Sequence, residues 1–291
     1  MGFEGDLQLE AFREHRPLLF SIAYRMLGTA ADAEDIVQEA YLRWIRVDPT
    51  SVRSPKDFLS TTVTRLAVDH LRSARVRREV YVGPWLPEPL VGVDDGDPIA
   101  ATELAESLST AFLVLLERLT PTQRAAYLLR DVFGYDYTEV ARILDTSESN
   151  CRQLVQRAKQ GVASGRPRFT RDAGAAQDLA RRFLDACTTG DMDGLVALLA
   201  DDAVAWADGG GKFAAARRPV VGVTRVARFL AAVVAKWRSS GDVHIDAVNG
   251  GLGLSLHVDG RLRGVITLDA GGDRVAQVFI VVNPDKLGDR H

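Results

Sequence analysis

The order of apolar and polar positions divides the chain into a helical part and a later part that contains strands. In the helical part, apolar residues recur three and four positions apart, which predicts amphipathic helices at 9–26, 32–46, 55–78 and from about 98 to 161. Ser54-Pro55 favours a helix start at residue 55, because proline suits the first helical position. The helix at 32–46 opens with acidic residues, which suit the positive end of the helix dipole.

From residue 176 the pattern changes. We expect helices at 176–188, 192–199 and about 223–237, with a strand at 203–207 between the second and the third. Alternating or apolar runs follow at 243–248, 253–258, 262–268 and 275–282, separated by glycine-rich turns. This order predicts an α+β domain with a strongly bent antiparallel sheet, placed after an all-α part.

Two segments interrupt the helical pattern and are predicted to be linkers, at 81–104 and 162–175. The first contains WLPEP, that is Trp85, Leu86, Pro87, Glu88 and Pro89, followed by an acidic stretch. An apolar motif stiffened by two prolines is unusual where a plain linker would suffice. A tryptophan between rigid neighbours is typical of an interface anchor.

Residues 119–159 have the spacing of a helix-turn-helix. Thr120, Pro121 and Gln123 predict a capped helix start, and a short helix at 137–144 is followed by a turn and by Ser147 as the next cap. In such a motif the second helix enters the major groove, where amide and guanidinium groups contact base edges. Its predicted outward positions are Ser149, Asn150, Arg152, Gln153, Gln156 and Arg157. The alternative is a pair of packed helices with a polar outer face.

The helix predicted at 55–78 becomes basic toward its end, with arginines at 65, 72, 75, 77 and 78 against Asp69 and Glu79. Such a helix end suits a polyanion. The alternative is that the arginines lie over the packed helix with their charges in water.

Composition places limits on these interpretations. The 291 residues carry a net charge of −3, and the segment 81–110 has 6 acidic and no basic residues, so any contact with DNA must come from local patches. No apolar run approaches the roughly 18 residues of a membrane span, and no signal peptide opens the sequence. Cys151 and Cys187 lie far apart without a CxxC pattern, which argues against a disulfide framework or a zinc site. We therefore expect a cytoplasmic protein without a cofactor.

Three segments together resemble the extracytoplasmic-function (ECF) sigma factors of RNA polymerase: 23–44, 55–79 and 112–160. The resemblance implies a sigma-two domain at 8–80 and a sigma-four domain at 105–161, with core RNA polymerase and promoter DNA as partners. On the polymerase side it implies the β′ clamp helices and the β flap. The resemblance assigns the clamp interface to Asp32, Asp35, Gln38 and Glu39. It assigns minus-ten recognition to Arg65, Asp69, Arg72 and Arg75, and minus-thirty-five recognition to the helix with Arg152 and Gln153.

WLPEP, together with DGGGK at 208–212 and NPDKL at 283–287, is similar to a subfamily that carries a fused SnoaL-like domain of the NTF2-like fold. The resemblance implies such a domain at 176–291, which regulates the sigma domains so that no separate anti-sigma factor is needed, and which offers a pocket for an unidentified small ligand. Besides WLPEP, it implies interdomain regulatory roles for Asp208, Lys212, Asn283, Pro284, Asp285, Lys286 and Leu287. DGGGK is not a phosphate loop, because Lys212 precedes Phe213 instead of serine or threonine.

Two other functions stay open from the residues alone. One is a ligand-responsive helix-turn-helix regulator that is no polymerase subunit. The other is an NTF2-like cyclase or isomerase fused to a DNA-binding module, for which an acid or base in an apolar pocket would be required. The candidates are His244, His257, Asp202 and Asp259, and nothing in the sequence pairs a histidine with a carboxylate. We therefore assign no catalytic residue and expect no enzyme.

Overall fold

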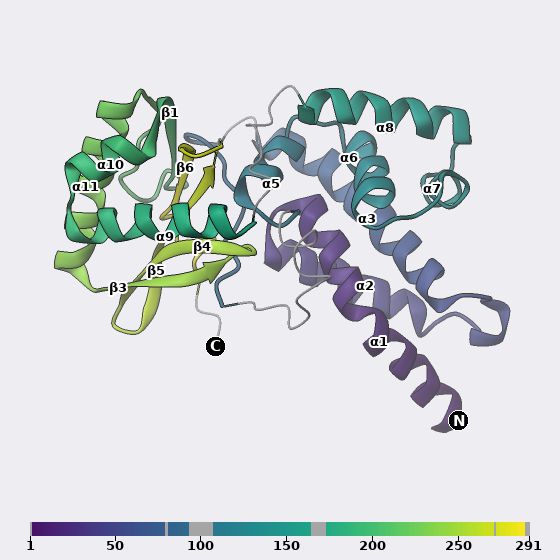
Figure 1. Cartoon of the computed structure of the whole chain (residues 1–291). Helices are drawn as coiled ribbons and strands as arrows, with labels where there is room; N and C mark the ends of the chain where they lie inside the picture. Colours follow the sequence, from purple (N-terminus) through teal and green to yellow (C-terminus); the bar gives the residue numbers. More distant parts are fainter. Residues whose placement is uncertain (1, 79–80, 93–106, 164–172, 271, 289–291) are drawn as a thin grey trace. The chain divides into compact units, whose positions relative to one another are not determined.

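The computed structural model describes residues 2–78, 81–92, 107–163, 173–270 and 272–288. The chain forms two compact units (Figure 1): unit 1 comprises residues 1–77 and 115–164, and unit 2 comprises residues 78–114 and 165–291. The predicted helix start at about residue 98 lies outside the described residues. Within the described residues, no helix combines the length and the apolar character that crossing a membrane requires.

The first half of unit 1 consists of α1 (Gly2–Leu27), α2 (Ala30–Trp44), the short 3-10 helix η1 (Pro49–Ser51) and α3 (Pro55–Arg78). Trp44 at the end of α2 is buried and anchors this half: its indole Nε1 donates to the carbonyl of Gln8, and Gln8 Nε2 donates back to the Trp44 carbonyl. The helices predicted at 9–26, 32–46 and 55–78 are all present, with α1 longer than predicted at its N-terminal end.

The second half of unit 1 carries the helix-turn-helix. Its elements are α6 (Pro121–Tyr127), the π-helical turn η2 (Leu128–Val132), α7 (Tyr137–Leu144) and α8 (Glu148–Ala163), while α5 (Thr110–Leu116) begins in unit 2. Thr120 with Gln123, and Asp136 with Glu139, form complete capping boxes. The short helix at 137–144 is confirmed, and Asp145 ends it in the left-handed conformation with φ 52°.

Unit 2 contains α9 (Ala173–Thr189), α10 (Met192–Leu198), α11 (Val223–Ser240) and one six-stranded sheet of order β2-β1-β6-β5-β4-β3. The strands are β1 (Leu199–Asp208), β2 (Val220–Val221), β3 (Asp242–Val248), β4 (Gly251–Val258), β5 (Arg261–Ala270) and β6 (Val275–Val281). The antiparallel meander is confirmed for β3 to β6, but β1 runs parallel to β6, so the sheet is mixed. A parallel pair needs a long crossover, which here spans five elements and leaves no local signal.

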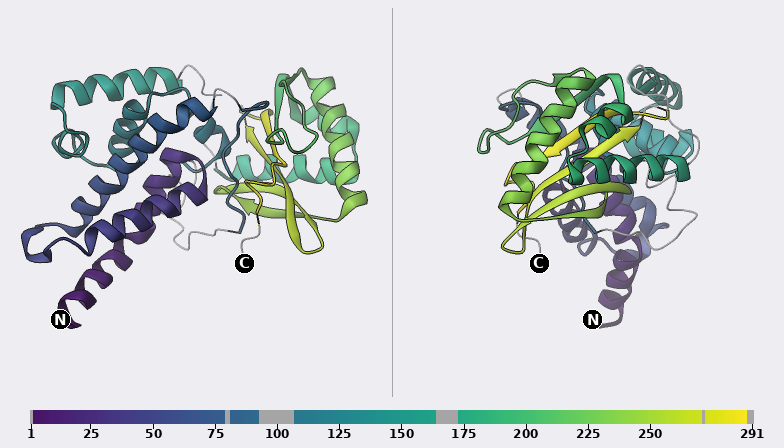
Figure 2. Two further views of the ribbon diagram at one scale, coloured as in Figure 1. Left: turned by 180° about the vertical axis from the view of Figure 1, so that it is seen from behind. Right: turned by 60° about the vertical axis from the view of Figure 1, so that its left-hand side comes forward.

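The two faces of the sheet have different covers. Helices α9, α10 and α11 cover one face of the sheet (Figures 1 and 2). There, Leu254, Ile266 and Val278 belong to an apolar core that includes residues of all three helices. On the other face, Val265, Phe279 and Val281 pack with Leu86 and Ala111, which come from the segment before the helix-turn-helix. Part of the predicted linker at 81–104 therefore belongs to the core of unit 2.

Candidate functional site

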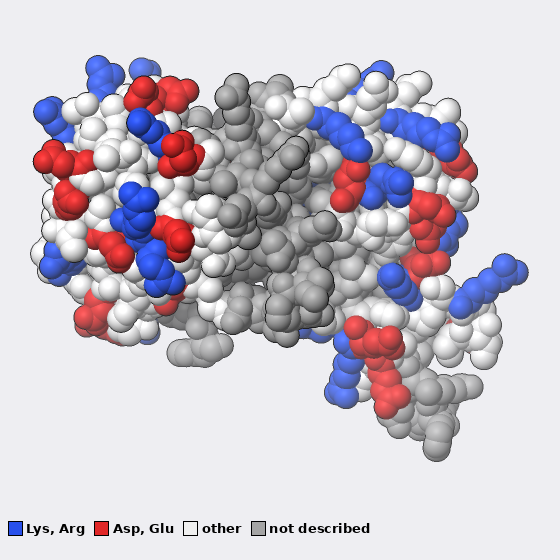
Figure 3. Space-filling model, viewed as in Figure 1, with Lys and Arg blue, Asp and Glu red and all other residues white. Residues whose placement is uncertain are grey.

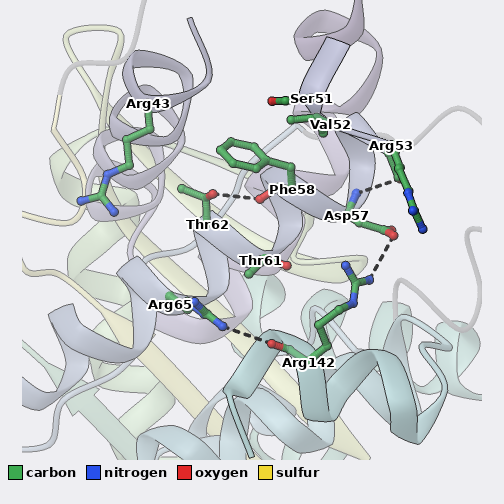
Figure 4. Close-up of a pocket in the computed structure, with 11 residues that line it drawn as sticks. Arg43, Ser51, Val52, Arg53, Asp57, Phe58, Thr61, Thr62, Arg65 and Arg142 are labelled. Carbon is green, nitrogen blue, oxygen red and sulfur yellow. Dashed lines mark hydrogen bonds and ion pairs between the residues drawn. The ribbon is translucent and has the colours of Figure 1, made fainter. Parts of the chain in front are cut away.

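Unit 1 contains a pocket of about 670 Å³ between the end of α2, the η1 loop, α3 and α7 (Figure 4). We call it the α3 pocket. Four arginines, from three helices and one loop, line it together with serine and threonine hydroxyls and one aromatic ring. Its lining residues are Arg43, Ser51, Val52, Arg53, Ser54, Asp57, Phe58, Thr61, Thr62, Arg65 and Arg142.

The chemistry of the α3 pocket suits an unstacked nucleotide. Guanidinium groups and hydroxyls bind phosphate and base edges, and an aromatic ring offers a stacking surface. The ring of Phe58 lies against Trp44, with centroids 5.4 Å apart, so it is held in place by a buried neighbour. The volume lies within the range of small-molecule and nucleotide sites, about 300–1,000 Å³.

Three of the pocket's four arginines already have partners: Arg43 pairs with Glu39 at 2.9 Å, and Arg65 and Arg142 bond between α3 and α7. Arg65 Nε donates to the carbonyl of Ile143 at 2.8 Å, and Arg65 Nη2 donates to the carbonyl of Arg142 at 3.1 Å. These carbonyls lie at the C-terminal end of α7, which favours a cation. Arg142 Nη2 in turn pairs with Asp57 Oδ2 at 3.0 Å (Figure 4). The first half of unit 1, through α3, and the second half, through α7, therefore share these contacts.

The four residues predicted to read the minus-ten element are not equivalent in the structure. Arg65 lines the α3 pocket, while Asp69 and Arg72 form an exposed pair at 3.1 Å one turn further along α3. The side chain of Arg75 lies outside the described ones. The pattern of the basic helix did not predict Arg53 or Arg142, since one lies in the preceding loop and the other on a distant helix.

The predicted recognition helix, α8, has one buried side and one exposed side, as its periodicity predicts. Cys151, Val155 and Ala158 are buried. Elongated patches of Lys and Arg lie over α8 in Figure 3. The Arg152 guanidinium lies 4.9 Å from the ring centroid of Tyr137 and pairs with Glu148, which orients it. The six positions predicted to face DNA are all exposed: Ser149, Asn150, Arg152, Gln153, Gln156 and Arg157.

The predicted polymerase face of α2 is partly free. Asp35 and Gln38 are exposed, while Asp32 accepts a hydrogen bond from Thr29 at 2.5 Å and Glu39 pairs with Arg43 at 2.9 Å. Two exposed apolar residues that the sequence pattern did not predict lie beside this face. Leu42 lies within α2, four residues on from Gln38, and Ile45 follows α2 directly, seven residues on from Gln38; they are 44% and 45% exposed. Their spacing from the acidic residues was the available signal.

In unit 2, the three motifs WLPEP, DGGGK and NPDKL meet around one buried carboxylate. Asp208 is fully buried at the end of β1 and accepts hydrogen bonds from Tyr81 Oη at 2.5 Å and from the backbone N–H of Leu86 at 2.9 Å. Lys286 Nζ lies 2.7 Å from the same carboxylate. We call this group, with Asn283, the linker site. Burial and the neighbouring Asp208 raise the pKa of Tyr81, so the phenol stays a donor.

Lys286 connects the C-terminal motif to the linker. Its ammonium group donates to the carbonyl of Leu86 and lies 4.2 Å from the ring centroid of Trp85, a cation–π contact. Asn283 Nδ2 donates to Tyr81 Oη at 2.8 Å. At the surface, Lys212 pairs with Asp285 at 2.6 Å, so DGGGK and NPDKL are joined by a buried and an exposed ion pair.

Close packing explains why DGGGK contains glycine. Gly210 has φ 60°, and a Cβ there would approach the side-chain atoms of Asn283 to 2.5 Å. WLPEP itself is largely buried from Leu86 to Pro89, and Leu287 packs beside Leu86. Pro284, which follows Asn283, is half-buried. The chain then pairs with the sheet, because Asn249 Oδ1 accepts from the N–H of Leu90 at 2.7 Å and Val91 bridges to Val248.

The candidate acid–base residues do not meet in an apolar pocket. His244, Asp202 and Asp259 are exposed. His257 lies edge-on to His244 with ring centroids 5.5 Å apart, at the edge of the sheet. Among the described residues, no group of three or more potential ligand side chains is placed to hold a metal ion.

Family models match three segments of the chain: Sigma-70 region 2 at residues 11–77, Sigma-70 region 4 at 109–160 and a SnoaL-like domain at 180–282. Of similar proteins, the ECF RNA polymerase sigma factor SigJ of Mycobacterium tuberculosis is 41% identical, over 96% of this chain and 92% of that one. The chain belongs to the ECF RNA polymerase sigma factors. It therefore binds core RNA polymerase and promoter DNA and directs where transcription begins.

Two further comparisons agree with this family. The probable ECF sigma factor SigI of Mycobacterium tuberculosis is 30% identical over 95% of this chain and 93% of its own length. The crystal structure of the SigJ sigma factor matches with a TM-score of 0.75 and 39% identity, covering 96% of each chain. The likeness thus includes the SnoaL-like domain as well as the sigma regions, and the predicted family and fold class are confirmed.

Proposed function

We propose that this sigma factor captures an unstacked base of the minus-ten element in the α3 pocket. The observation that carries this assignment is the convergence of four arginines, several hydroxyls and the Phe58 ring on one concavity. Melting without ATP requires that the unpaired strand be held once its bases leave the stack. Arg65 belongs to the pocket, and Asp69 and Arg72 would follow the strand along α3.

A binding experiment tests the pocket. A fluorescent single-stranded oligonucleotide carrying the minus-ten element is titrated against core polymerase loaded with the full-length protein. We expect Arg53→Gln to weaken binding, because Arg53 is the pocket arginine of the η1–α3 loop. Arg13→Gln is the matched control, since Arg13 is exposed on α1 and does not line the pocket. Equal affinities of the two variants would contradict the assignment.

For the other two sigma surfaces we propose the roles that their exposure supports. Asp35, Gln38 and the adjacent apolar Leu42 and Ile45 form a surface for the β′ clamp helices, with Asp32 and Glu39 at its border. The exposed polar side of α8 reads the minus-thirty-five element. Substituting Gln153 by alanine should then relax discrimination at one or two minus-thirty-five positions, and unchanged preference among promoter variants would count against α8 as the reader.

We further propose that the SnoaL-like domain regulates the sigma regions by holding residues 81–92, without a separate anti-sigma factor. The linker site supports this, because Asp208, Asn283 and Lys286 all bond to the segment that precedes the sigma-four region. An unidentified small ligand of this domain could shift the same equilibrium. Run-off transcription with core polymerase tests the idea. Deletion of residues 283–291 should change promoter-specific output, and unaltered output at several promoters would refute the linker role.

A further inference from the structure

The α3 pocket has a second property besides its chemistry: its own residues hold the two halves of unit 1 together. Arg65 of α3 bonds the carbonyls of Arg142 and Ile143, and Asp57 of α3 pairs with the Arg142 side chain. Because α7 is the first helix of the helix-turn-helix, the minus-ten pocket and the minus-thirty-five module are in direct contact.

Buried contacts also join the two halves of unit 1, in an arrangement that we call closed. Tyr135 Oη donates to Ser60 Oγ at 2.9 Å, and both residues are buried. Arg124 of α6 is 3% exposed and donates to the carbonyl of Met26, at the C-terminal end of α1, at 2.6 Å. Each half of unit 1 thus places an arginine on the C-terminal end of a helix of the other half.

The closed arrangement is too short for a promoter. Arg142 lines the α3 pocket, and α8 begins six residues later at Glu148. Six residues span at most about 21 Å. The minus-ten and minus-thirty-five elements are centred about 25 base pairs apart, which is roughly 85 Å of duplex. The closed unit 1 therefore cannot place the pocket and α8 on both elements at once.

We propose that the α3 pocket is also the latch of unit 1, so that a promoter strand entering the pocket releases the helix-turn-helix from α3. A phosphate offers Arg65 an anionic partner that it can bind through two N–H groups, in place of the neutral carbonyls that it holds in the closed form. The phosphate also competes with Asp57 for Arg142. This inference rests on the proposed minus-ten role of the pocket and adds that occupancy and opening are coupled.

Coupling of this kind is reciprocal, so loosening the closed form must strengthen strand binding. Tyr135→Phe removes one buried hydrogen bond between the halves while leaving every lining residue of the pocket in place. We expect it to raise the affinity of the full-length protein for the minus-ten strand about fivefold, the equilibrium change that loss of one neutral hydrogen bond brings. Arg13→Gln, on the exposed side of α1, should leave the affinity unchanged.

Opening is measured as a distance between fluorophores in the full-length protein. Glu14→Cys on α1 and Gln160→Cys on α8 place labels at exposed positions in the two halves. The native thiols should not compete, because Cys151 and Cys187 are buried, and burial raises the pKa of Cys187 to about 12 and that of Cys151 above its usual range.

We expect the label distance to lengthen on adding the strand, and to be longer in Tyr135→Phe before any strand is added. Strand binding, followed by anisotropy, with an unchanged label distance would overturn the coupling and leave the pocket assignment standing. Absence of binding to both the native protein and Tyr135→Phe would overturn the pocket assignment itself. A strand that binds Tyr135→Phe no more tightly than the native protein also contradicts the latch.

Discussion

The α3 pocket and the linker site both gather charged side chains, but they differ in burial and therefore in what they can do. In the pocket, Arg142 pairs with Asp57 while its side chain is 56% exposed. In the linker site, the side chains of Lys286 and Asp208 are 6% and 0% exposed. Exposed pairs contribute about 0–1 kcal/mol, whereas breaking a buried pair costs about 3–5 kcal/mol. The first site is thus suited to exchanging partners, and the second to holding one partner.

The largest effect is expected when the buried pair is broken. Lys286→Met leaves the Asp208 carboxylate buried without its cation and removes the contact with Trp85. We expect a loss of about 3–5 kcal/mol in the free energy of unfolding of unit 2. Chemical denaturation of the full-length protein, followed by tryptophan fluorescence, measures this loss. A change below about 1 kcal/mol would remove the contrast between the two sites.

Asp269 sharpens the comparison, because it is a buried carboxyl group with an oxygen that has no hydrogen-bond partner among the described residues. Burial raises its pKa from 3.8 to about 6, against a hydrogen bond from Gln277 that lowers it. The folded protein then keeps this proton to higher pH than the unfolded chain does. Stability is therefore highest below the unfolded pKa and falls as pH rises through this window.

The measurement compares the native protein with Asp269→Asn, which cannot ionise. Between pH 4 and pH 8 the free energy of unfolding of the native protein should fall relative to the variant, by up to about 3 kcal/mol. The difference should develop mainly between pH 4 and 6 and then level off. Parallel pH profiles for the two proteins would show that Asp269 stays accessible to water.

For the exposed site, the comparison predicts a change in binding without a change in stability. Arg53→Gln in the α3 pocket should weaken binding of the minus-ten strand about tenfold, a loss of roughly 1.4 kcal/mol, and reduce its dependence on salt concentration. The free energy of unfolding should stay within about 0.5 kcal/mol of the native value. A large drop in stability would mean that the pocket is built like the linker site.

The smallest effect is expected at the exposed ion pair that joins DGGGK to NPDKL beside the linker site. Lys212→Met removes the pair with Asp285, whose two side chains are 59% and 61% exposed. The expected loss in the free energy of unfolding is below about 1 kcal/mol. This variant is the matched control for Lys286→Met, because both remove a lysine that joins DGGGK to NPDKL. Equal losses in the two variants would show that burial does not decide the strength of these pairs.

Local signals predicted much of the fold. The helix-turn-helix was readable because capping residues such as Thr120 mark its helix starts, and the meander because apolar alternation stops at glycine turns. The parallel pairing of β1 with β6 was not readable, since the two strands lie about seventy residues apart and no local pattern records their register. The same limit applies to Arg142, which joins the α3 pocket only through tertiary packing.

For the two sites, the types of residue predicted the kind of partner, but the sequence did not predict which residues come together. The basic end of α3 pointed to DNA, yet of the three predicted residues whose side chains the structure describes, only Arg65 lines the pocket. The pairing of Lys286 with Asp208 joins positions 78 residues apart and could be suggested only by the co-occurrence of unusual motifs. The regulatory role of WLPEP and the assignments to polymerase and promoter stay predictions, to be decided by the experiments above.

The packing of residues 81–92 and of the start of α5 on the sheet has a practical consequence. The SnoaL-like domain is discontinuous in sequence, because Leu86 and Ala111 complete the core around Phe279 and Val281. A fragment that starts at residue 173 would expose this apolar face, and the end of edge strand β3 would lose its bridge to Val91. Uncovered edges and apolar faces promote self-association. A soluble C-terminal fragment should therefore need residues 81–114 supplied in cis or as a separate peptide.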